Sequence, residues 1–281
     1  MLELQKVGTD IELFLWDKAR LIPIPVVGML GGTKKDPKPV PELGEGFAVQ
    51  EDNVMVEFNV PPAATAAEFA NNVNVMVEYL RRLFAPKGLD LVALPSMRFL
   101  PESLQSRQAQ VFGCEPDFDA WNLVENEIDR SDLSLATLRT AGGHVHVSFT
   151  EDGDVPSMEM KIRLARSLDF HLGLPSLLID KDAMRRKLYG NPGAFRPKSY
   201  GIEYRALSNF WAKSPELSAW VFSACVAAIE FCNRGQDADS LLENHRDVPI
   251  NHFRENFFVP EHGIWLADKF GVVAPPNQFW E

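Results

Sequence analysis

The chain has 281 residues, of which 46% are hydrophobic, and it carries a formal net charge of -11 at pH 7. This length and apolar content suffice for one large folded unit with its own core, and we expect a single domain over residues 1–281. The acidic balance argues against a nucleic acid as the main partner, because binding to a phosphate backbone depends on a positive surface that releases counterions.

The cysteines and the N-terminal segment indicate the compartment. Three cysteines lie far apart and form no CxxC pair, which argues against a disulfide framework or a Cys-type zinc site. The first residues, MLELQKVGTDIELFLWDKAR, carry scattered charges and no apolar stretch long enough for a signal peptide or a membrane helix. We therefore expect a cytoplasmic protein without a membrane partner.

The first part of the chain predicts two strands and a helix. Alternating or continuous apolar residues predict strands over residues 9–16 and 54–60. Between them, a stretch rich in Gly, Pro and Lys predicts a long loop over residues 28–46. A helix follows, because Thr65 and Glu68 form a capping box and Gly88 comes after its end.

The second part predicts two further strands and two helices. The strands cover residues 144–149 and 201–207, and an amphipathic surface helix runs over residues 158–172. Another helix begins at the N-cap Ser214 and is apolar on nearly all sides, so we expect it to be buried. The tail, residues 253–281, shows no clear periodicity, and we expect irregular structure there.

All four predicted strands place ionisable groups on one face and apolar groups on the other. Residues two apart along a strand share a face, which groups the following polar residues: Asp10, Glu12, Glu57, His144, His146, Glu203 and Arg205. The solvated face of an antiparallel sheet would explain any single pair. The set as a whole offers oxygen and nitrogen donors that suit Mg or Mn. If these carboxylates meet in one groove, they repel one another, and a bound cation would offset that repulsion.

The His144 and His146 pair allows another reading. HxH on a strand also begins the cupin signature, with Glu151 as the acid, and occurs in metal-dependent hydrolases. The second cupin element, a histidine close behind a Pro-Gly turn, is missing, and a hydrolase barrel would need more histidine ligands. This alternative stays open beside a structural role for a buried imidazole pair.

A basic stretch leads into the last of the four strands. It contains Arg185, Arg186, Arg196 and Lys198, interspersed with glycines at positions 190 and 193. Such residues neutralise phosphate oxygens, and glycine permits close backbone approach. A solvated basic loop is the ordinary alternative, but the stretch runs directly into the strand of Glu203. Together with a cation bound by carboxylates, it indicates a nucleoside triphosphate site.

The motifs in order, GTDIE, VEFNVPPA, GGHVHVS and YGNPGAFRPKSYGIEYR, resemble the carboxylate-amine ligases of the glutamine synthetase and glutamate-cysteine ligase superfamily, and most closely the phage-type COOH-NH2 ligases (amidoligases). The resemblance implies an α+β fold, with a curved antiparallel sheet that lines an active-site funnel and helices packed on its outer face. It also implies a single ligase catalytic domain over residues 1–281 that uses ATP and Mg2+ or Mn2+.

The resemblance also implies residue roles. The metal ligands would be Asp10, Glu12, Glu57, His144 and Glu203. The nucleotide would contact His146, Arg185, Arg186, Arg196 and Lys198, and the catalytic residues would be Arg205 and Glu57. Asp10 stands where larger relatives commonly have Glu, and one acid of the second motif is missing, for which Glu51 and Asp52 are both candidates.

The implied activity is the formation of an amide or peptide bond through an acyl phosphate. The expected partners are small-molecule or peptide carboxylates and amines, and not nucleic acid or a membrane; homo-oligomer formation is left open. Two other functions remain: the hydrolase or cupin-type enzyme, and a non-catalytic nucleotide-binding protein with the same fold.

Overall fold

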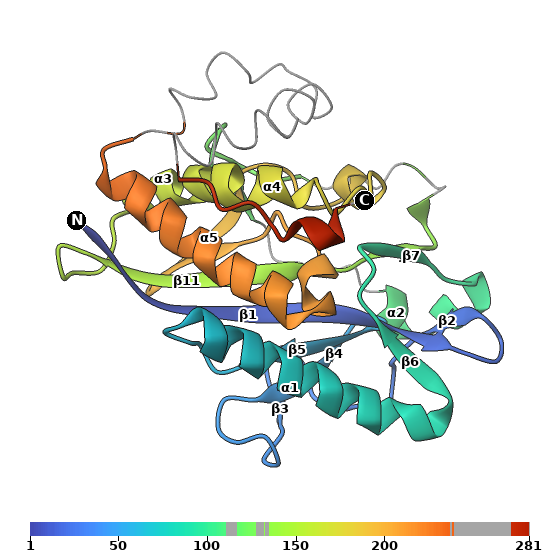
Figure 1. Cartoon of the computed structure of the whole chain (residues 1–281). Helices are drawn as coiled ribbons and strands as arrows, with labels where there is room; N and C mark the ends of the chain where they lie inside the picture. The colour runs from blue at the N-terminus through green and yellow to red at the C-terminus, as the bar shows by residue number, and fades with distance from the viewer. Residues whose placement is uncertain (111–116, 128–131, 133–134, 237, 239–270, 281) are drawn as a thin grey trace.

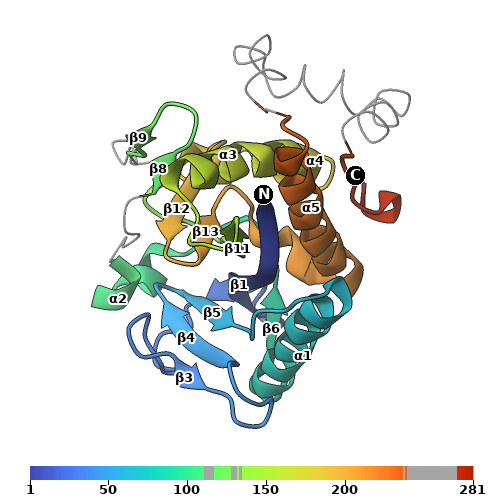
Figure 2. The same cartoon turned by 90° about the vertical axis from the view of Figure 1, so that its left-hand side faces the viewer.

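The computed structural model describes residues 1–110, 117–127, 132, 135–236, 238 and 271–280. A mainly antiparallel sheet has the strand order β3-β4-β5-β1-β11-β13-β12-β8-β9, with β2 and β6 paired to β1. Viewed along β1, these strands follow an arc, and helices α1, α3 and α5 lie along its outer side (Figure 2). The predicted α+β class with helices on the outer face of a curved, open sheet is therefore confirmed, whereas the funnel stays a prediction.

Strand β1 (Leu2–Asp17) is the long central strand (Figure 1). It pairs antiparallel with β5 (Met55–Asn59) on one side and with β11 (Gly143–Glu151) on the other. The predicted strand began only at residue 9, because a register shift between Leu4 and Lys6 breaks the alternation of buried residues. Beyond the metal-type residues, the strand continues and pairs with β2 and β6.

The basic stretch forms a strand where the sequence suggested a loop. Strand β12 (Ala194–Lys198) pairs antiparallel with β13 (Gly201–Tyr204), which in turn pairs with β11. Gly193 and Gly201 on either side, and Pro197 within the strand, obscured the strand pattern. As a consequence, the side chains of Arg196 and Lys198 have fixed directions, since both share the face of Glu203 across the pair Arg196↔Glu203.

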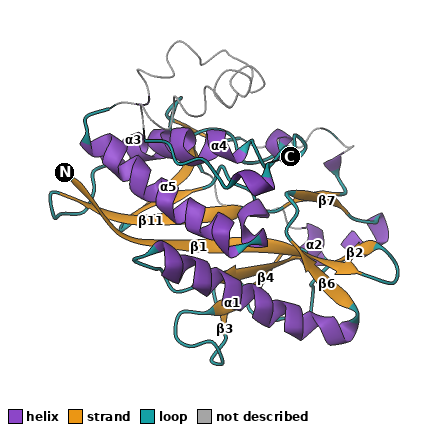
Figure 3. Cartoon of the chain, viewed as in Figure 1, coloured by secondary structure: helices purple, strands orange, loops and turns teal. Residues whose placement is uncertain are grey.

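The helices begin where the sequence predicts. In α1 (Ala66–Phe84) the Thr65 side chain caps the Glu68 amide, and in α5 (Pro215–Asn233) the Ser214 side chain caps the Leu217 amide. Helix α3 (Met158–Leu168) is shorter than expected, because the chain continues as a π-helical turn from Asp169 to Gly173. These helices cover one side of the long strands in Figure 3.

Helix α5 is a core helix. Its length and composition would allow it to cross a membrane, but 67% of its apolar window is buried inside the protein. It contributes Val221, Ala224 and Cys225 to the main core cluster, together with apolar residues of β1 and α1. This burial is what the sequence predicted for it.

The remaining elements are short. They are β2 (Ile22–Ile24), β3 (Lys38–Pro39), β4 (Ala48–Asp52), β6 (Leu89–Val92), β7 (Ser96–Arg98), β8 (Phe118–Asp119), β9 (Val124–Glu125), β10 (Leu138–Thr140), α2 (Arg107–Gln110) and α4 (Leu174–Ser176). Of the predicted irregular tail, residues 253–270 and 281 lie outside the described residues. Its described part contains a 3-10 turn, and the Val273 carbonyl accepts a hydrogen bond from the Trp220 indole at 2.7 Å.

Candidate functional site

One face of the sheet is apolar and packs against the helices. The polar face therefore points away from the helices. Ile11, Val145 and Ile202 are fully buried in the main core cluster. Strand pairing then aligns their polar neighbours in rows across the sheet: Glu12 opposite Glu57, Asp10 opposite His144, and His146 opposite Glu203. The acids and imidazoles singled out from the sequence therefore come together on one face, although they come from four different strands.

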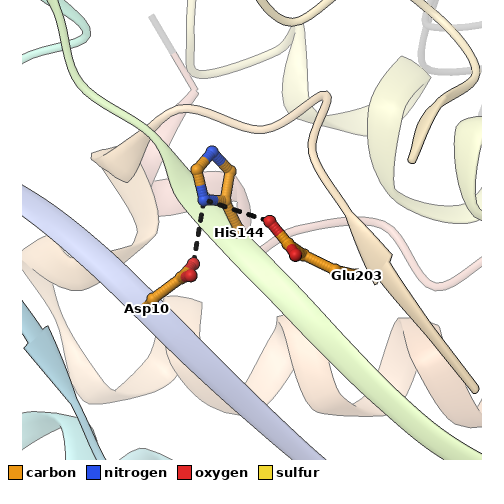
Figure 4. A group of neighbouring side chains, drawn as sticks. All are labelled: Asp10, His144 and Glu203. Carbon is orange, nitrogen blue, oxygen red and sulfur yellow. Dashed lines mark hydrogen bonds and ion pairs between the residues drawn. The ribbon is translucent and has the colours of Figure 1, made fainter. Parts of the chain in front are cut away.

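We call one part of this set the histidine half; it comprises Asp10, His144, His146, Glu203, Arg196, Lys198 and Arg205. Asp10 lies at its centre. Its carboxylate is 2.8 Å from His144 Nδ1, and Glu203 Oε1 is 3.9 Å from the same nitrogen (Figure 4). The Asp10 carboxylate is also 3.3 Å from His146 Nε2. One donor atom each from Asp10, His144 and Glu203 lies within 4.8 Å of the others, a spacing that a single metal ion can bridge.

Cations surround Glu203. Its Oε2 atom is 2.7 Å from Lys198 Nζ, and its Oε1 atom is 3.1 Å from Arg196 and also contacts Arg205. Burial and the charge of Asp10 oppose ionisation, but His144, Arg205 and Arg196 outweigh them and lower the pKa of Glu203 to about 2. Burial likewise opposes ionisation of Asp10, and the two histidines hold its pKa well below the usual value. The histidine half is thus charge-compensated.

We call the other part the acidic half; it comprises Glu12, Asp52, Glu57 and Gln50. Burial, followed by the charge of Asp52, raises the pKa of Glu12 to about 8, although the Gly142 amide donates to its carboxylate at 2.6 Å. Burial and the charges of Asp10 and Asp52 raise the pKa of Glu57 well above its usual value. Among the described residues, no Lys, Arg or His forms an ion pair with Glu12, Asp52 or Glu57.

Apolar packing explains why the acidic half is desolvated. Phe14 lies two residues after Glu12 on β1, and Met55 lies two residues before Glu57 on β5, so each shares a face with its acid. Both belong to a second core cluster, which includes Phe99 from the connection after β7. The polar face therefore becomes apolar just beyond Glu12 and Glu57. Low polarity there disfavours the ionised carboxylates and raises their pKa values.

The donors of the acidic half fit a hard divalent cation. Gln50 donates from Nε2 to Glu57 Oε2 at 2.6 Å, while its buried Oε1 has no hydrogen-bond partner among the described residues. An orphaned buried oxygen costs free energy that a ligand can recover. Carboxylate and amide oxygens are the ligands that Mg2+ and Mn2+ prefer, and the imidazoles of the histidine half also suit Mn2+.

The structure separates the two candidates for the missing acid. Glu51 accepts hydrogen bonds from the backbone amides of Gly28, Leu30 and Gly31 at 2.8–2.9 Å and so anchors the long loop after β2. Asp52 instead forms a side-chain hydrogen bond with Glu12, and burial raises its pKa. Asp52 is therefore the additional acid of the site, and Glu51 has a structural role.

The basic residues also divide into two groups. Arg196, Lys198 and Arg205 reach Glu203, as described above. The environment of Arg185 argues against its predicted phosphate contact, because its buried guanidinium donates to the backbone carbonyls of residues 141, 205, 206 and 207. Arg186 bonds to the carbonyls of Asp180 and Asp182 within its own segment.

The two glycines of the basic stretch have internal explanations. A Cβ on Gly190 would overlap the Arg185 guanidinium, and one on Gly193 would come within 2.6 Å of the Trp121 ring. Both residues have φ near +75°, which also favours glycine. Their conformations therefore accommodate neighbouring side chains, whereas the sequence suggested approach to a phosphate.

Three residues of the site were not found from the sequence. Gln50 holds Glu57, Asp117 accepts from Arg205 Nε at 2.9 Å, and the Tyr200 hydroxyl lies 2.5 Å from His146 Nδ1. The contacts of Asp117 and Tyr200 join segments that are distant in sequence, 88 and 54 residues apart. Only Gln50 had a usable signal, since it lies seven residues before Glu57, and the structure places the two in a hairpin of β4 and β5.

The position of Glu151 argues against the hydrolase or cupin-type reading. Along β11, His144 and His146 share one face, whereas Glu151 has the opposite parity and pairs with Leu2 at the far end of the strand. Its carboxylate accepts a hydrogen bond from the Ser157 amide at 2.8 Å. Glu151 is therefore not placed to complete a metal site with the two histidines.

Comparison with known proteins agrees with this geometry. The fold is similar to that of two solved structures. Apo GmaS matches with a TM-score of 0.52 at 16% identity, over 99% of this chain and 66% of that chain. A bifunctional glutathione synthetase from Pasteurella multocida matches with a TM-score of 0.50 at 12% identity, over 94% of this chain and 49% of that chain. At such identities the likeness shows the fold alone.

The family comparison is more specific. Residues 136–245 match the family model described as phage phiEco32-like COOH.NH2 ligase-type 2. This match and the fold confirm the predicted resemblance to the amidoligases. No curated protein matches the chain by sequence. The chain spans less than two thirds of each of the two solved chains above.

Proposed function

We propose that this protein is an ATP-dependent and Mg2+- or Mn2+-dependent carboxylate-amine ligase, which forms an amide or peptide bond through an acyl phosphate. One observation carries the proposal: acids and imidazoles of four strands meet on one face beside Arg196, Lys198 and Arg205. The substrates are small-molecule or peptide carboxylates and amines. We place the protein in the cytoplasm, and a homo-oligomer remains open.

The donors divide into two groups that would hold divalent cations. Asp10, His144 and Glu203 form one group, and Glu12, Asp52 and Glu57 form the other. Bound divalent cations would neutralise phosphate oxygens and polarise the γ-phosphate. Glu57, which the resemblance marks as catalytic as well as metal-binding, is assigned to metal binding here, since Gln50 fixes one of its oxygens.

The cationic residues would offset the charge that gathers as a carboxylate approaches a triphosphate. The N–H groups of Arg196 and Lys198 contact the Glu203 carboxylate in this structure. When a nucleotide binds, they can donate hydrogen bonds to its phosphate oxygens instead. Arg205 contacts Glu203 and Asp117, so its guanidinium has a defined orientation. A guanidinium held in this way stabilises the transferred phosphoryl group or the substrate carboxylate without reorganisation during the reaction.

The proposed reaction has two steps. A substrate carboxylate oxygen attacks the γ-phosphorus, the bond to the β-phosphate oxygen breaks, and ADP leaves. The amine nitrogen then attacks the acyl carbon, the C–O bond breaks, and phosphate leaves with the amide formed. The amine gives up a proton during this second step, and we assign no residue as the base.

The test is release of ADP and phosphate by the purified protein. Mg-ATP is supplied with a panel of carboxylates, and hydroxylamine serves as a general amine that traps acyl phosphates. We expect release that depends on one class of carboxylate and that falls at least 100-fold in Glu203→Gln. The matched control Glu45→Gln, on an exposed loop, retains activity. Binding of Mg-ATP without release for any pair would favour the non-catalytic nucleotide-binding protein. A retained transition metal without ATP affinity would favour a hydrolase.

A further inference from the structure

Arg205 is held through two of its nitrogens. Its Nη1 contacts the Glu203 carboxylate and lies 3.3 Å from His144 Nδ1, whereas its Nε donates to Asp117 at 2.9 Å. The guanidinium is planar, so contacts at two different nitrogens fix its plane. The two contacts come from different parts of the sheet, because Glu203 lies on β13 and Asp117 lies just before β8.

Strand pairing places Asp117 on the polar face of the sheet. Phe118 pairs with Phe195 of β12, and their ring centroids are 6.3 Å apart. Phe195 belongs to the main core cluster and Phe118 packs against that cluster, so both face the helices. Asp117 is the next residue along the extended chain and therefore points the other way, towards the metal-type donors.

The hairpin of β8 and β9 is closed at Asp117. Asn126 donates to Asp117 twice, from its backbone amide to the carbonyl and from Nδ2 to Oδ1, both at 2.8 Å. Asp119 accepts hydrogen bonds from two backbone amides of the turn. The two carboxylate oxygens of Asp117 thus have separate donors, since Oδ1 accepts from Asn126 and Oδ2 from Arg205. Asp117 is a fixed acceptor for Arg205.

The two anchors of Arg205 differ in what else they can bind. Glu203 and His144 belong to the donor group that a single metal ion can bridge. A cation bound by that group would compete with Arg205 for the Glu203 carboxylate and would repel the guanidinium. Asp117 is not part of the group, so its contact with Nε does not compete with a cation.

We propose that Asp117 is a positioning residue, which holds Arg205 in place when a divalent cation and a nucleotide occupy the site. This inference rests on the proposed function and adds a residue to it. Asp117 acts through Arg205 alone. Without this anchor the guanidinium would lose the fixed orientation from which it stabilises the transferred phosphoryl group.

Exchange of the Arg205 Nε proton with solvent tests the anchor without any reaction. It is measured by nuclear magnetic resonance on protein with isotopically labelled arginine, with and without Mg2+, and Arg205→Lys identifies the signal by removing it. We expect the wild-type proton to stay protected under both conditions. In Asp117→Ala its exchange with Mg2+ present should rise about tenfold or more, and it should rise less without Mg2+, because Glu203 then still holds Arg205. The matched control Asp119→Asn, in the same hairpin, should exchange like the wild type.

Kinetics test the consequence, in the ligase assay described above and after circular dichroism has shown that the variants are folded. Asp117→Ala should lower kcat about 10- to 100-fold and leave the KM for Mg-ATP within about twofold, since Arg196 and Lys198 remain for the phosphates. Asp117→Asn keeps an acceptor oxygen and should lower kcat less, by about threefold to tenfold. Asp119→Asn should keep the wild-type values.

Other results overturn the inference in distinguishable ways. If Mg2+ exposes the Arg205 proton in the wild type, or if Asp117→Ala keeps it protected, Asp117 is not the anchor. If Asp119→Asn acts like Asp117→Ala, or if the KM for Mg-ATP rises as kcat falls, the hairpin has only a structural role. If no pair of substrates releases ADP, the proposed function fails, and the exchange experiment still decides whether Asp117 holds Arg205.

Discussion

The two halves of the site share strand β1, and the pKa values of their carboxyl groups are shifted in opposite directions. In the histidine half, Glu203 and Asp10 have lowered pKa values because cations and imidazoles face them. In the acidic half, Glu12 and Glu57 have raised pKa values because burial and neighbouring carboxyls oppose ionisation. The first half is organised by its own ion pairs. The second half holds protons that a cation must displace, so most of the stabilisation by a bound cation is expected there.

The largest expected effect tests the compensated half. Glu203→Gln leaves Arg196, Lys198 and Arg205 clustered without their shared carboxylate. We expect the free energy of unfolding, measured with urea at pH 7, to fall by about 3–5 kcal/mol, because the cluster of cations then loses the buried carboxylate that its members share. The control Glu45→Gln should change it by less than about 0.5 kcal/mol. A loss below about 1 kcal/mol for Glu203→Gln would mean that these ion pairs do not organise the histidine half.

A pH series tests the acidic half. The pKa of Glu12 is raised to about 8 from an ordinary value of 4.5, so the folded state holds a proton that the unfolded state releases. Stability from this group is fully present below about pH 4.5 and is lost as the pH rises towards 8. We expect metal-free protein to lose on the order of 4 kcal/mol from this cause between about pH 4.5 and pH 8, and Glu12→Gln to remove that part of the pH dependence.

Added Mg2+ sharpens the same experiment. Because binding displaces the protons, the rise in Tm that Mg2+ produces should be larger at pH 8 than at pH 6 in the wild type. In Glu12→Gln the rise should be small at both pH values. Equal Mg2+ effects at the two pH values in the wild type would contradict the assignment of Glu12 as a cation ligand.

Gln50 offers a change in the opposite direction. Gln50→Glu places a fourth carboxyl opposite Glu57, so the metal-free protein should lose about 1–3 kcal/mol through repulsion and desolvation. The same variant should bind Mn2+ more tightly, since it gains an anionic ligand. Gln50→Leu is the matched control, because it removes the amide oxygen without adding charge and should weaken Mn2+ binding. Electron paramagnetic resonance of free Mn2+ measures both, and tighter binding by Gln50→Leu would rule out Gln50 Oε1 as a ligand.

The smallest effect separates two neighbouring acids. Asp52→Asn should raise the Kd for Mg2+ about tenfold, equivalent to about 1.4 kcal/mol, because Asp52 lies beside Glu12. Glu51→Gln should leave that Kd within about twofold and instead increase hydrogen exchange at the amides of Gly28, Leu30 and Gly31, which it holds. The reverse pattern would assign the cation to Glu51.

The sequence predicted those parts of the molecule that depend on local periodicity. Alternation along β1, β5, β11 and β13 placed the acids and imidazoles on one face, and the capping residues Thr65 and Ser214 located two helices. Glu51 and Asp52 could also have been distinguished: Asp52 shares the parity of Gln50, which pairs with Glu57, whereas Glu51 has the opposite parity.

Features that depend on strand pairing could not be predicted. The pKa values are lowered in the histidine half and raised in the acidic half because of the order of the strands in the sheet. The sequence alone does not give that order. The backbone contacts of Arg185, the Tyr200 bond to His146 and the Asp117 bond to Arg205 link segments 20 to 88 residues apart. Strand β12 was also not predicted, because it lies in a stretch rich in Gly and Pro and neither residue type favours the interior of a strand.

Anomalous diffraction at the manganese edge, from crystals soaked in Mn2+, tests the central claim most directly. The account predicts manganese peaks within coordination distance of Asp10, His144 and Glu203, and of Glu12, Asp52 and Glu57. Peaks confined to other surfaces, or their absence from both groups at saturating Mn2+, would contradict it.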